Sequence, residues 1–264
     1  MIRFCPLFSS SSGNSVYIGD REGGILVDVG RSAKQTDLML KNIGVDPCEI
    51  KGIFLTHEHI DHVNGLCVFA KKHKIPVYAS TGTILALKQK NILCEQHIDI
   101  SINDAPVTVA GMEIEPFKTS HDCADGIGYV ITGCDGSTKA AIATDTGFVS
   151  TDILKKLTGC RLVYIESNHD VAMLKTGPYP YQLQKRILSD IGHLSNNACA
   201  DTLKAIINKG STHFVLAHLS QENNTPDLAY NTSVNALRDM GALPNRDYIL
   251  KVAEPENTSG IITV

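Results

Sequence analysis

Four potential metal ligands lie at the end of an apolar run, and this cluster constrains the chain more than any other feature. Ile53-Phe54-Leu55 predicts a short strand, and His57, His59, Asp61 and His62 follow it closely. In an extended chain, alternate side chains such as His57 and His59 point to the same side. If the chain then turns into a helix, Asp61 and His62 are directed elsewhere. One loop can then present two ligands to one metal and two to its neighbour, so two nearby metals are predicted.

Two other metal motifs do not fit the cluster. The helical zinc-protease motif His-Glu-x-x-His requires a second histidine where this chain has Asp61, and the preceding residues are typical of a strand. A closed structural zinc site favours cysteine, and no cysteine lies within the cluster. The remaining alternative is a group of ordinary surface residues at a strand end, and the density of ligands argues against it.

Composition excludes few classes of function. The chain has 264 residues, is 43% hydrophobic and carries a formal net charge of -4. This length supports a full core, and we expect a single domain over residues 1–264. The net charge gives no global basic field, so any contact with nucleic acid has to come from a local patch. Every apolar run is far shorter than the roughly 20 residues that span a bilayer, and Pro6 interrupts the first one.

The eight cysteines are scattered without a Cys-x-x-Cys pair. A chain of this size does not need disulfide bonds to fold, so this pattern predicts free thiols in a reducing compartment. We therefore expect a cytoplasmic protein with no membrane partner. The oligomeric state stays open.

Short β-rich runs alternate with helical patterns along the chain. Strands are expected over 16–18, 25–27, 52–55, 77–79, 161–165 and 212–217, and a hairpin over 128–132 and 139–144. Helices are expected over 81–90, 181–189, 196–208 and 226–240, with Ser195 as an N-cap and Gly241 as a stop. Two groups of strands interleaved with helices predict a layered α/β protein.

The string Thr56-His57-x-His59-x-Asp61-His62 after a hydrophobic strand resembles the signature of the metallo-β-lactamase superfamily. Further residues typical of that family follow in order along nearly the whole chain: Asp28, His121 in Thr-Ser-His-Asp, Asp145 in Thr-Asp-Thr-Gly, and His218 in Ala-His-Leu-Ser. The resemblance implies an α/β fold, a four-layer αββα sandwich. The active site would lie at the strand ends between the two sheets.

The resemblance also implies a ligand set. One metal would be held by His57, His59 and His121, and the other by Asp61, His62 and His218, with Asp145 bridging both. Asp28 would orient the histidine loop without binding metal. Nitrogen and carboxylate ligands without thiolate fit Zn, Mn or Fe, and the affinity order alone does not decide among them. Related flavo-diiron proteins have a glutamate in place of His59, so the pattern indicates hydrolysis and not redox chemistry.

Two neighbouring metals lower the pKa of a bridging water, generate hydroxide and stabilise charge on an attacked phosphoryl or carbonyl group. The predicted catalytic residues are Asp61, Glu166 and His193. A carboxylate that holds an imidazole raises its basicity, so a protonated His193 can stabilise phosphorane-like charge and pass a proton to the leaving oxygen. Phosphodiesterase branches of the superfamily carry such a pair between the bridging aspartate and the last histidine.

Longer strings are similar to the bacterial YycJ/WalJ subfamily, for which a DNA exonuclease role is implied: residues 10–15, 166–170, 192–196 and 217–224. The leading hypothesis is therefore a phosphodiesterase that acts as a 5′ to 3′ DNA exonuclease. One alternative is a hydrolase of a small cyclic phosphodiester, thioester or lactone. A metal-dependent binding module is the weakest hypothesis, because it needs neither the full ligand set nor a proton donor.

Candidate substrate contacts are Ser11, Ser12, Asn14 and Asn196. The stretch from Ser9 to Ser15 fits a flexible turn or a loop that offers hydroxyls and amides to phosphate, and the sequence does not separate the two. Tyr179, Tyr181, Lys185 and Arg186 could stack on a base and contact phosphate. An amphipathic helix with solvated cations is the favoured interpretation of that segment.

Overall fold

The computed structural model describes residues 1–103 and 105–264, which divide into two compact units. Unit 1 consists of Met1–Phe117, Cys123–Thr138 and Glu254–Val264, and unit 2 consists of Lys118–Asp122 and Lys139–Ala253. Each unit is therefore assembled from segments that are separated along the chain. The expectation of a single domain over the whole chain stays a prediction.

Unit 1 contains a seven-stranded sheet with the order β14-β1-β2-β3-β4-β5-β6. Its strands are β1 Arg3–Ser10, β2 Gly13–Asp20, β3 Gly23–Val27, β4 Ile50–Phe54, β5 Val77–Ala79, β6 Asp99–Ser101 and β14 Ile262–Thr263. The pairs β14–β1, β1–β2 and β2–β3 are antiparallel, and the pairs from β3 to β6 are parallel. Because β3 and β4 are parallel neighbours, the residues that follow them emerge at the same edge of the sheet.

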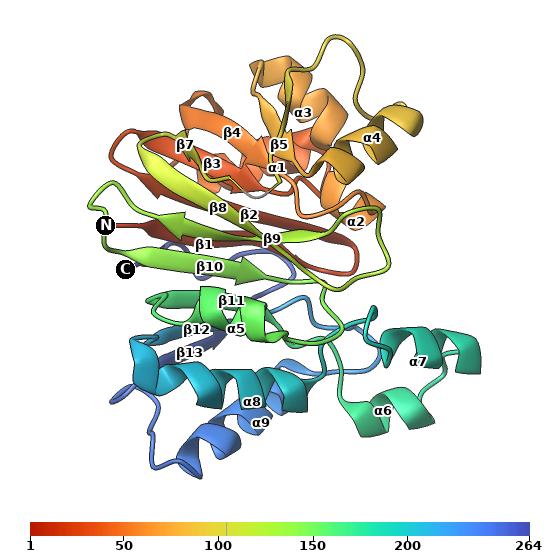
Figure 1. The fold of residues 1–264 in the computed structure, drawn as a ribbon, viewed down its shortest axis with the longest axis vertical. Helices are drawn as coiled ribbons and strands as arrows, with labels where there is room; N and C mark the ends of the chain where they lie inside the picture. Colours follow the sequence, from red (N-terminus) through yellow and green to blue (C-terminus); the bar gives the residue numbers. More distant parts are fainter. Residues whose placement is uncertain (104) are drawn as a thin grey trace. The chain divides into compact units, whose positions relative to one another are not determined.

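Helices cover one face of this sheet (Figure 1). They are α1 Ala33–Asn42, α3 Leu66–His73 and α4 Thr81–Gln89, and the short helices η1 Pro47–Glu49 and α2 Ile60–Val63 lie in connections. Leu40, Phe69 and Leu87 from these helices share a buried apolar cluster with Leu26 and Ile53 from the strands. Unit 1 also holds β9 Ile127–Thr132, all but the last residue of β8 Met112–Lys118, and β7 Val107–Val109, which pairs antiparallel with β8.

Unit 2 is built on four parallel strands in the order β13-β12-β11-β10. They are β10 Lys139–Ala143, β11 Leu162–Glu166, β12 His213–Ala217 and β13 Ile249–Val252. All five residues of β11 are buried, as expected for a central parallel strand. The helices are α5 Thr151–Leu157, α6 Val171–Thr176, α7 Tyr181–Ile187, α8 Asn196–Ile206, η2 Ile207–Lys209 and α9 Pro226–Arg238. Helices α8 and α9 pack against each other (Figure 1).

Several local predictions are confirmed. The Ser195 hydroxyl accepts a hydrogen bond from Ala198 N at 3.2 Å and caps α8. Helix α9 ends at Arg238, and Gly241 follows with a φ of 80°. Helix α7 ends at Ile187, two residues before the predicted end. Among the described residues, no helix has the length and apolar character needed to span a membrane.

Candidate metal centre

The histidine loop of unit 1 turns from an extended segment into a short helix, as the sequence predicts. After β4 the chain continues through His57, and His59 is the N-cap of the short helix α2, which carries Asp61 and His62. The ring centroids of His57 and His59 are 4.5 Å apart, and those of His57 and His62 are 4.2 Å apart. Three imidazoles and a carboxylate therefore gather at one strand end of this unit, because an extended segment turns directly into a helix.

Asp28 holds the histidine loop in place. It follows β3 and is buried, and its carboxylate accepts hydrogen bonds from Thr56 N at 2.8 Å and the Thr56 hydroxyl at 2.9 Å. His62 Nδ1 lies 2.8 Å from the same carboxylate. Burial raises the pKa of Asp28, against the His62 charge and the hydrogen bonds from His62 and Thr56, which lower it. Asp28 thus contacts two residues of the histidine loop, and its role in orienting metal ligands stays a prediction.

Asn14 contacts the loop directly. Its Nδ2 donates to Asp61 Oδ2 at 3.3 Å and lies 3.2 Å from His62 Nε2. Its Oδ1 accepts from Ser10 N at 3.1 Å, which ties the loop to the β1–β2 turn. The sequence suggested Asn14 as a substrate contact, and the structure places it beside two candidate metal ligands.

Unit 2 contains a second cluster, centred on Glu166 at the end of β11. Glu166 Oε1 lies 2.7 Å from His193 Nδ1 and 2.8 Å from His218 Nδ1, and Oε2 accepts hydrogen bonds from two backbone amides, Thr146 N and Leu194 N, each at 3.1 Å. Donor atoms of Asp145, Glu166, His193 and His218 all lie within 4.8 Å of one another. The predicted pair of Glu166 and His193 is thus in direct contact, and Glu166 also holds His218.

The charges of this cluster are coupled. Burial alone would raise the pKa of Glu166, but the charges and hydrogen bonds of His193 and His218 hold it below its usual range. Burial lowers the pKa of His193, but the charge of Glu166 and its hydrogen bond raise this pKa by more. The pKa of His193 therefore lies above its usual value. The pair therefore favours an ionised carboxylate beside a protonated imidazole.

His121 is positioned by the main chain. Its Nδ1 lies 3.0 Å from the carbonyl oxygen of Gly192, the residue before His193. The ring centroids of His121 and His193 are 4.9 Å apart. A Cβ on Gly192 would lie 2.2 Å from the Ile187 carbonyl oxygen, so only glycine fits at this position.

The hydrogen bonds of three imidazoles favour the tautomer in which Nε2 can bind a divalent metal. Carboxylates and carbonyls only accept hydrogen bonds, so Nδ1 of His62, His121 and His218 must donate to Asp28, Gly192 and Glu166. Metal-binding histidines use one ring nitrogen as a ligand and donate the other N–H to a carboxylate or backbone carbonyl. Within each unit, the donor set is therefore arranged as a metal site requires.

The proposed substrate contacts differ in exposure. Ser11 and Ser12 are exposed at the β1–β2 turn. Asn196 is buried, and its amide exchanges two hydrogen bonds of 2.9 Å with Asn224 and accepts a third from Ser167 at 2.7 Å. Asn196 thus connects α8 to the segments that follow β11 and β12. Its direct contact with substrate stays a prediction.

The segment from Tyr179 to Arg186 is largely exposed. Arg186 is paired with Asp122 through two hydrogen bonds, the Nη2 bond measuring 2.9 Å. Tyr181 is 66% exposed, and the Lys185 ammonium lies 5.0 Å from the centroid of its ring. Helix α7 is thus largely exposed, and the guanidinium of Arg186 is engaged by a carboxylate, while contact of this segment with substrate stays a prediction.

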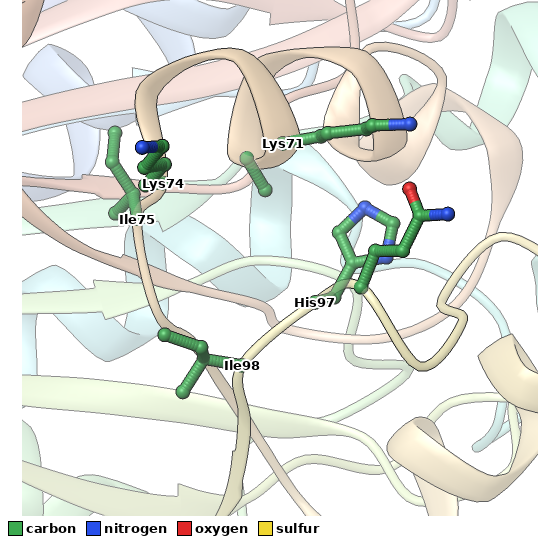
Figure 2. Close-up of a pocket in the computed structure, with 7 residues that line it drawn as sticks. Lys71, Lys74, Ile75, His97 and Ile98 are labelled. Atoms are coloured by element: carbon green, nitrogen blue, oxygen red, sulfur yellow. The ribbon is translucent and has the colours of Figure 1, made fainter.

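A hollow of about 390 Å³ lies elsewhere on unit 1, between the end of α3 and the segment before β6 (Figure 2). His97 lines it with both ring nitrogens engaged: Nδ1 accepts from Cys94 N at 3.1 Å, and Nε2 lies 3.0 Å from the Cys67 carbonyl oxygen. The side chains of Lys71 and Lys74 point in different directions (Figure 2). This hollow lacks convergent ligands and takes no part in the candidate centre.

Sequence reasoning missed the residues that hold the ligands. Thr56 was part of the motif, but its contact with Asp28 was not predicted. Gly192, Thr146 and Leu194 act through their main chains, and only the position of Gly192 directly before His193 could have indicated its role. The contact of Arg31 with the β1–β2 turn next to the histidine loop was also not predicted, because no motif in the sequence indicates it.

Comparisons with known proteins identify the family of this chain. The family model described as the beta-lactamase superfamily domain matches residues 24–219. Exodeoxyribonuclease YycJ of Bacillus anthracis is 38% identical over 242 residues, which cover 91% of this chain and 90% of that protein. Exodeoxyribonuclease WalJ of Streptococcus pneumoniae D39 is 35% identical over 240 residues, which cover 89% and 88%.

A solved structure shows the same fold. The metallo-β-lactamase fold protein YhfI from Bacillus subtilis superimposes with a TM-score of 0.72 at 17% identity, covering 97% of this chain and 98% of that chain. The predicted fold class, the α/β sandwich of that fold, is thereby confirmed. The family match and the identity to YycJ and WalJ extend over most of the sequence. The chain therefore belongs to the metallo-β-lactamase superfamily and, within it, to the YycJ/WalJ subfamily.

Proposed function

We propose that this protein is a metal-dependent phosphodiesterase that degrades DNA from the 5′ end. The observation that carries the proposal is the carboxylate of Glu166, whose Oε1 contacts Nδ1 of both His193 and His218. Two relatives that share at least 35% of their residues with this chain are named exodeoxyribonucleases, which supports DNA as the substrate.

We propose two divalent metals, Zn, Mn or Fe. His57, His59 and His121 would hold one, and Asp61, His62 and His218 the other, with Asp145 shared between them. The Nδ1 contacts of the imidazoles and the family membership support this assignment. When bound, the metals would activate a water molecule and offset the charge that grows on the attacked phosphoryl group.

Side chains of the protein would supply the proton that the leaving oxygen needs. Glu166 keeps His193 oriented and protonated, because its charge raises the pKa of the imidazole. As the P–O bond breaks, His193 would pass its proton to the departing oxygen and then recover one from solvent. Asp28 and Asn14 would keep His62 and Asp61 in position throughout.

The cysteines agree with a substrate inside the cell. All eight are free thiols in the structure. Free thiols persist in a reducing compartment, which supports the cytoplasm as the place of action.

The test is hydrolysis of DNA labelled at either end. Protein loaded with Mn²⁺ or Zn²⁺ should release labelled mononucleotide early from 5′-labelled DNA and late from 3′-labelled DNA. His193→Ala should lower the rate by about 10²- to 10⁴-fold, the usual contribution of a general acid. His213→Ala, which changes a histidine of β12 outside the cluster, should retain the rate.

Two results would contradict the proposal. One is the absence of metal-dependent nucleotide release, and the other is full activity of His193→Ala. Turnover of small cyclic phosphodiesters, thioesters or lactones without turnover of oligonucleotides would instead assign the same residues to a small-molecule hydrolase.

A further inference from the structure

Arg31 is fixed against the β1–β2 turn. Its Nη2 donates a hydrogen bond to the Ser12 hydroxyl at 2.8 Å, and its Cζ lies 6.0 Å from the centroid of the Phe8 ring. The chain leaves room for this side chain, because a Cβ on Gly13 would lie 2.6 Å from Arg31 Cδ. A long cation is thus held in one place next to a serine-rich turn.

The charge of Arg31 is not balanced locally. Among residues 1–103 and 105–264, no carboxylate forms an ion pair with it, whereas Arg186 pairs with Asp122 and Arg246 with Asp247. Within the same residues, the buried Nε of Arg31 has no hydrogen-bond partner. A buried N–H of a charged group is unfavourable unless it meets an acceptor, so the protein itself satisfies this guanidinium only in part.

Arg31 is connected to the candidate metal ligands within unit 1. Gly30 N donates to the Asn14 carbonyl at 2.8 Å, and a Cβ on Gly30 would lie 1.8 Å from the Asp61 carbonyl oxygen. Asn14 Nδ2 in turn donates to Asp61 Oδ2. Arg31 directly follows Gly30, and Ser12 lies two residues before Asn14. Both members of the Arg31–Ser12 pair are therefore next to residues that contact the histidine loop.

We infer that Arg31 and Ser12 form a phosphate-binding subsite beside the metal centre, which takes a phosphate of the DNA strand next to the one that is cleaved. The guanidinium fork matches phosphate oxygens, and hydroxyl groups commonly complete such contacts. The same chemistry would accept an internal phosphodiester or a terminal phosphate. The inference rests on the proposed function, because it needs a substrate with more than one phosphate.

The subsite predicts a specific loss in binding. Metal-loaded protein is titrated with a fluorescent phosphorothioate oligonucleotide that resists cleavage, and anisotropy is followed at several salt concentrations. Arg31→Gln should raise Kd about 10-fold and reduce the slope of log K against log salt by about 1, because one phosphate contact is lost. Arg31→Lys should retain most of the slope. Arg21→Gln, which changes an exposed arginine of the β2–β3 turn, should bind as the parent protein does.

A second variant separates phosphate binding from folding. Ser12 is exposed, so Ser12→Ala should fold normally, and it should raise Kd about 3-fold because one solvent-exposed hydrogen bond from a hydroxyl group to the phosphate is removed. Activity measured in parallel should show a larger rise in KM for the oligonucleotide than for bis-p-nitrophenyl phosphate, which has a single phosphate. Thermal melting of each variant reports whether Arg31 only stabilises the turn.

Oligonucleotides with a 5′-phosphate or a 5′-hydroxyl distinguish the two sources of the phosphate. If Arg31→Gln loses the same affinity for both oligonucleotides, the subsite binds an internal phosphate. If the loss of affinity is confined to the 5′-phosphorylated strand, the subsite binds the terminal phosphate. If the parent protein degrades DNA and Arg31→Gln keeps its Kd and salt slope, the subsite is wrong and the nuclease stands. If the parent protein neither binds nor degrades DNA, the proposed function itself fails.

Discussion

At the scale of the residue, backbone strain is found at two candidate metal ligands, Asp145 and His218, and at Asp28, which contacts the histidine loop. Asp28, Asp145 and His218 each follow a strand and have φ angles of 62°, 55° and 54°. Residues other than glycine rarely adopt this left-handed backbone conformation, which is unfavourable by about 1 kcal/mol or more. The surrounding structure therefore maintains an unfavourable backbone conformation at all three positions.

The contact between Asp28 and His62 predicts the effect of Asp28→Asn. An amide cannot accept hydrogen bonds on both sides, so either His62 or Thr56 would lose its acceptor. We expect the affinity for Zn²⁺ or Mn²⁺ to fall about 10- to 100-fold, the usual effect of removing a carboxylate behind a metal-binding histidine. Competition with a chromogenic chelator measures this. Asp20→Asn changes a buried carboxylate of the same sheet outside the loop and should leave the affinity unchanged.

His169 predicts a pH dependence of stability. Burial lowers its pKa to about 4, and neither ring nitrogen has a hydrogen-bond partner within the described part of the chain. Between about pH 6.5 and pH 4 the unfolded chain binds a proton at this residue and the folded chain does not, so stability falls as the pH falls. The full effect is about 3 kcal/mol.

His169→Leu removes this titration at similar volume. Urea unfolding at pH 8 and pH 5 should show a smaller loss of stability for the variant than for the parent protein. Equal losses would show that His169 is protonated in the folded state as readily as in the unfolded one.

The parts of the site that depend on local spacing could be predicted from the sequence. His57 and His59 are two residues apart in an extended segment, and the turn into α2 redirects His62. The role of Asn14 could not be predicted, because its partner Asp61 lies 47 residues away and contact depends on which strands are neighbours. Arg31 is a similar case, since Ser12 approaches it only once the sheet has formed.

At the scale of the element, the loop after β3 is packed directly against the histidine loop. Val29 N donates to the His62 carbonyl at 2.8 Å, and Gly65 N donates to the Val29 carbonyl at 2.9 Å. The two segments thus form a main-chain unit in which Gly30 provides the close approach. Helix α2 is only four residues long, so its position depends on these contacts more than on its own hydrogen bonds.

Gly30→Ala should disturb this unit. The added methyl group would meet the Asp61 carbonyl oxygen and Asn14 N, both main-chain atoms, so the backbone has to move. We expect a loss of about 1–3 kcal/mol in the free energy of unfolding and weaker metal binding. Gly52→Ala is the control, because its nearest atoms are side-chain carbons at 3.1 Å, which can move aside. Equal effects of the two substitutions in denaturant titrations would argue against a special role for Gly30.

At the scale of the whole molecule, metal binding should contribute to stability. A ligand that binds only the folded protein, at about 1,000 times its Kd, adds about 4 kcal/mol to the free energy of unfolding. For a chain of this size that corresponds to about 10 °C in Tm. Calorimetry before and after dialysis against EDTA should show this decrease, and added Zn²⁺ or Mn²⁺ should reverse it. In His57→Ala the chelator should have a smaller effect. A Tm that is indifferent to chelation would contradict a resident metal.

The first strand of unit 1 obtains one of its neighbours from a segment about 260 residues further along the chain, because β1 pairs with β14. Arg3 pairs with Thr263 and Phe4 with Ile262, so β14 covers the edge that β1 would otherwise expose. During synthesis, the amino-terminal sheet must wait with an open edge until residues 254–264 leave the ribosome. A message truncated before that point would yield chains with an unprotected strand, which is prone to pair with other chains. Deletions within residues 254–264 are therefore expected to reduce the yield of folded protein before they affect chemistry.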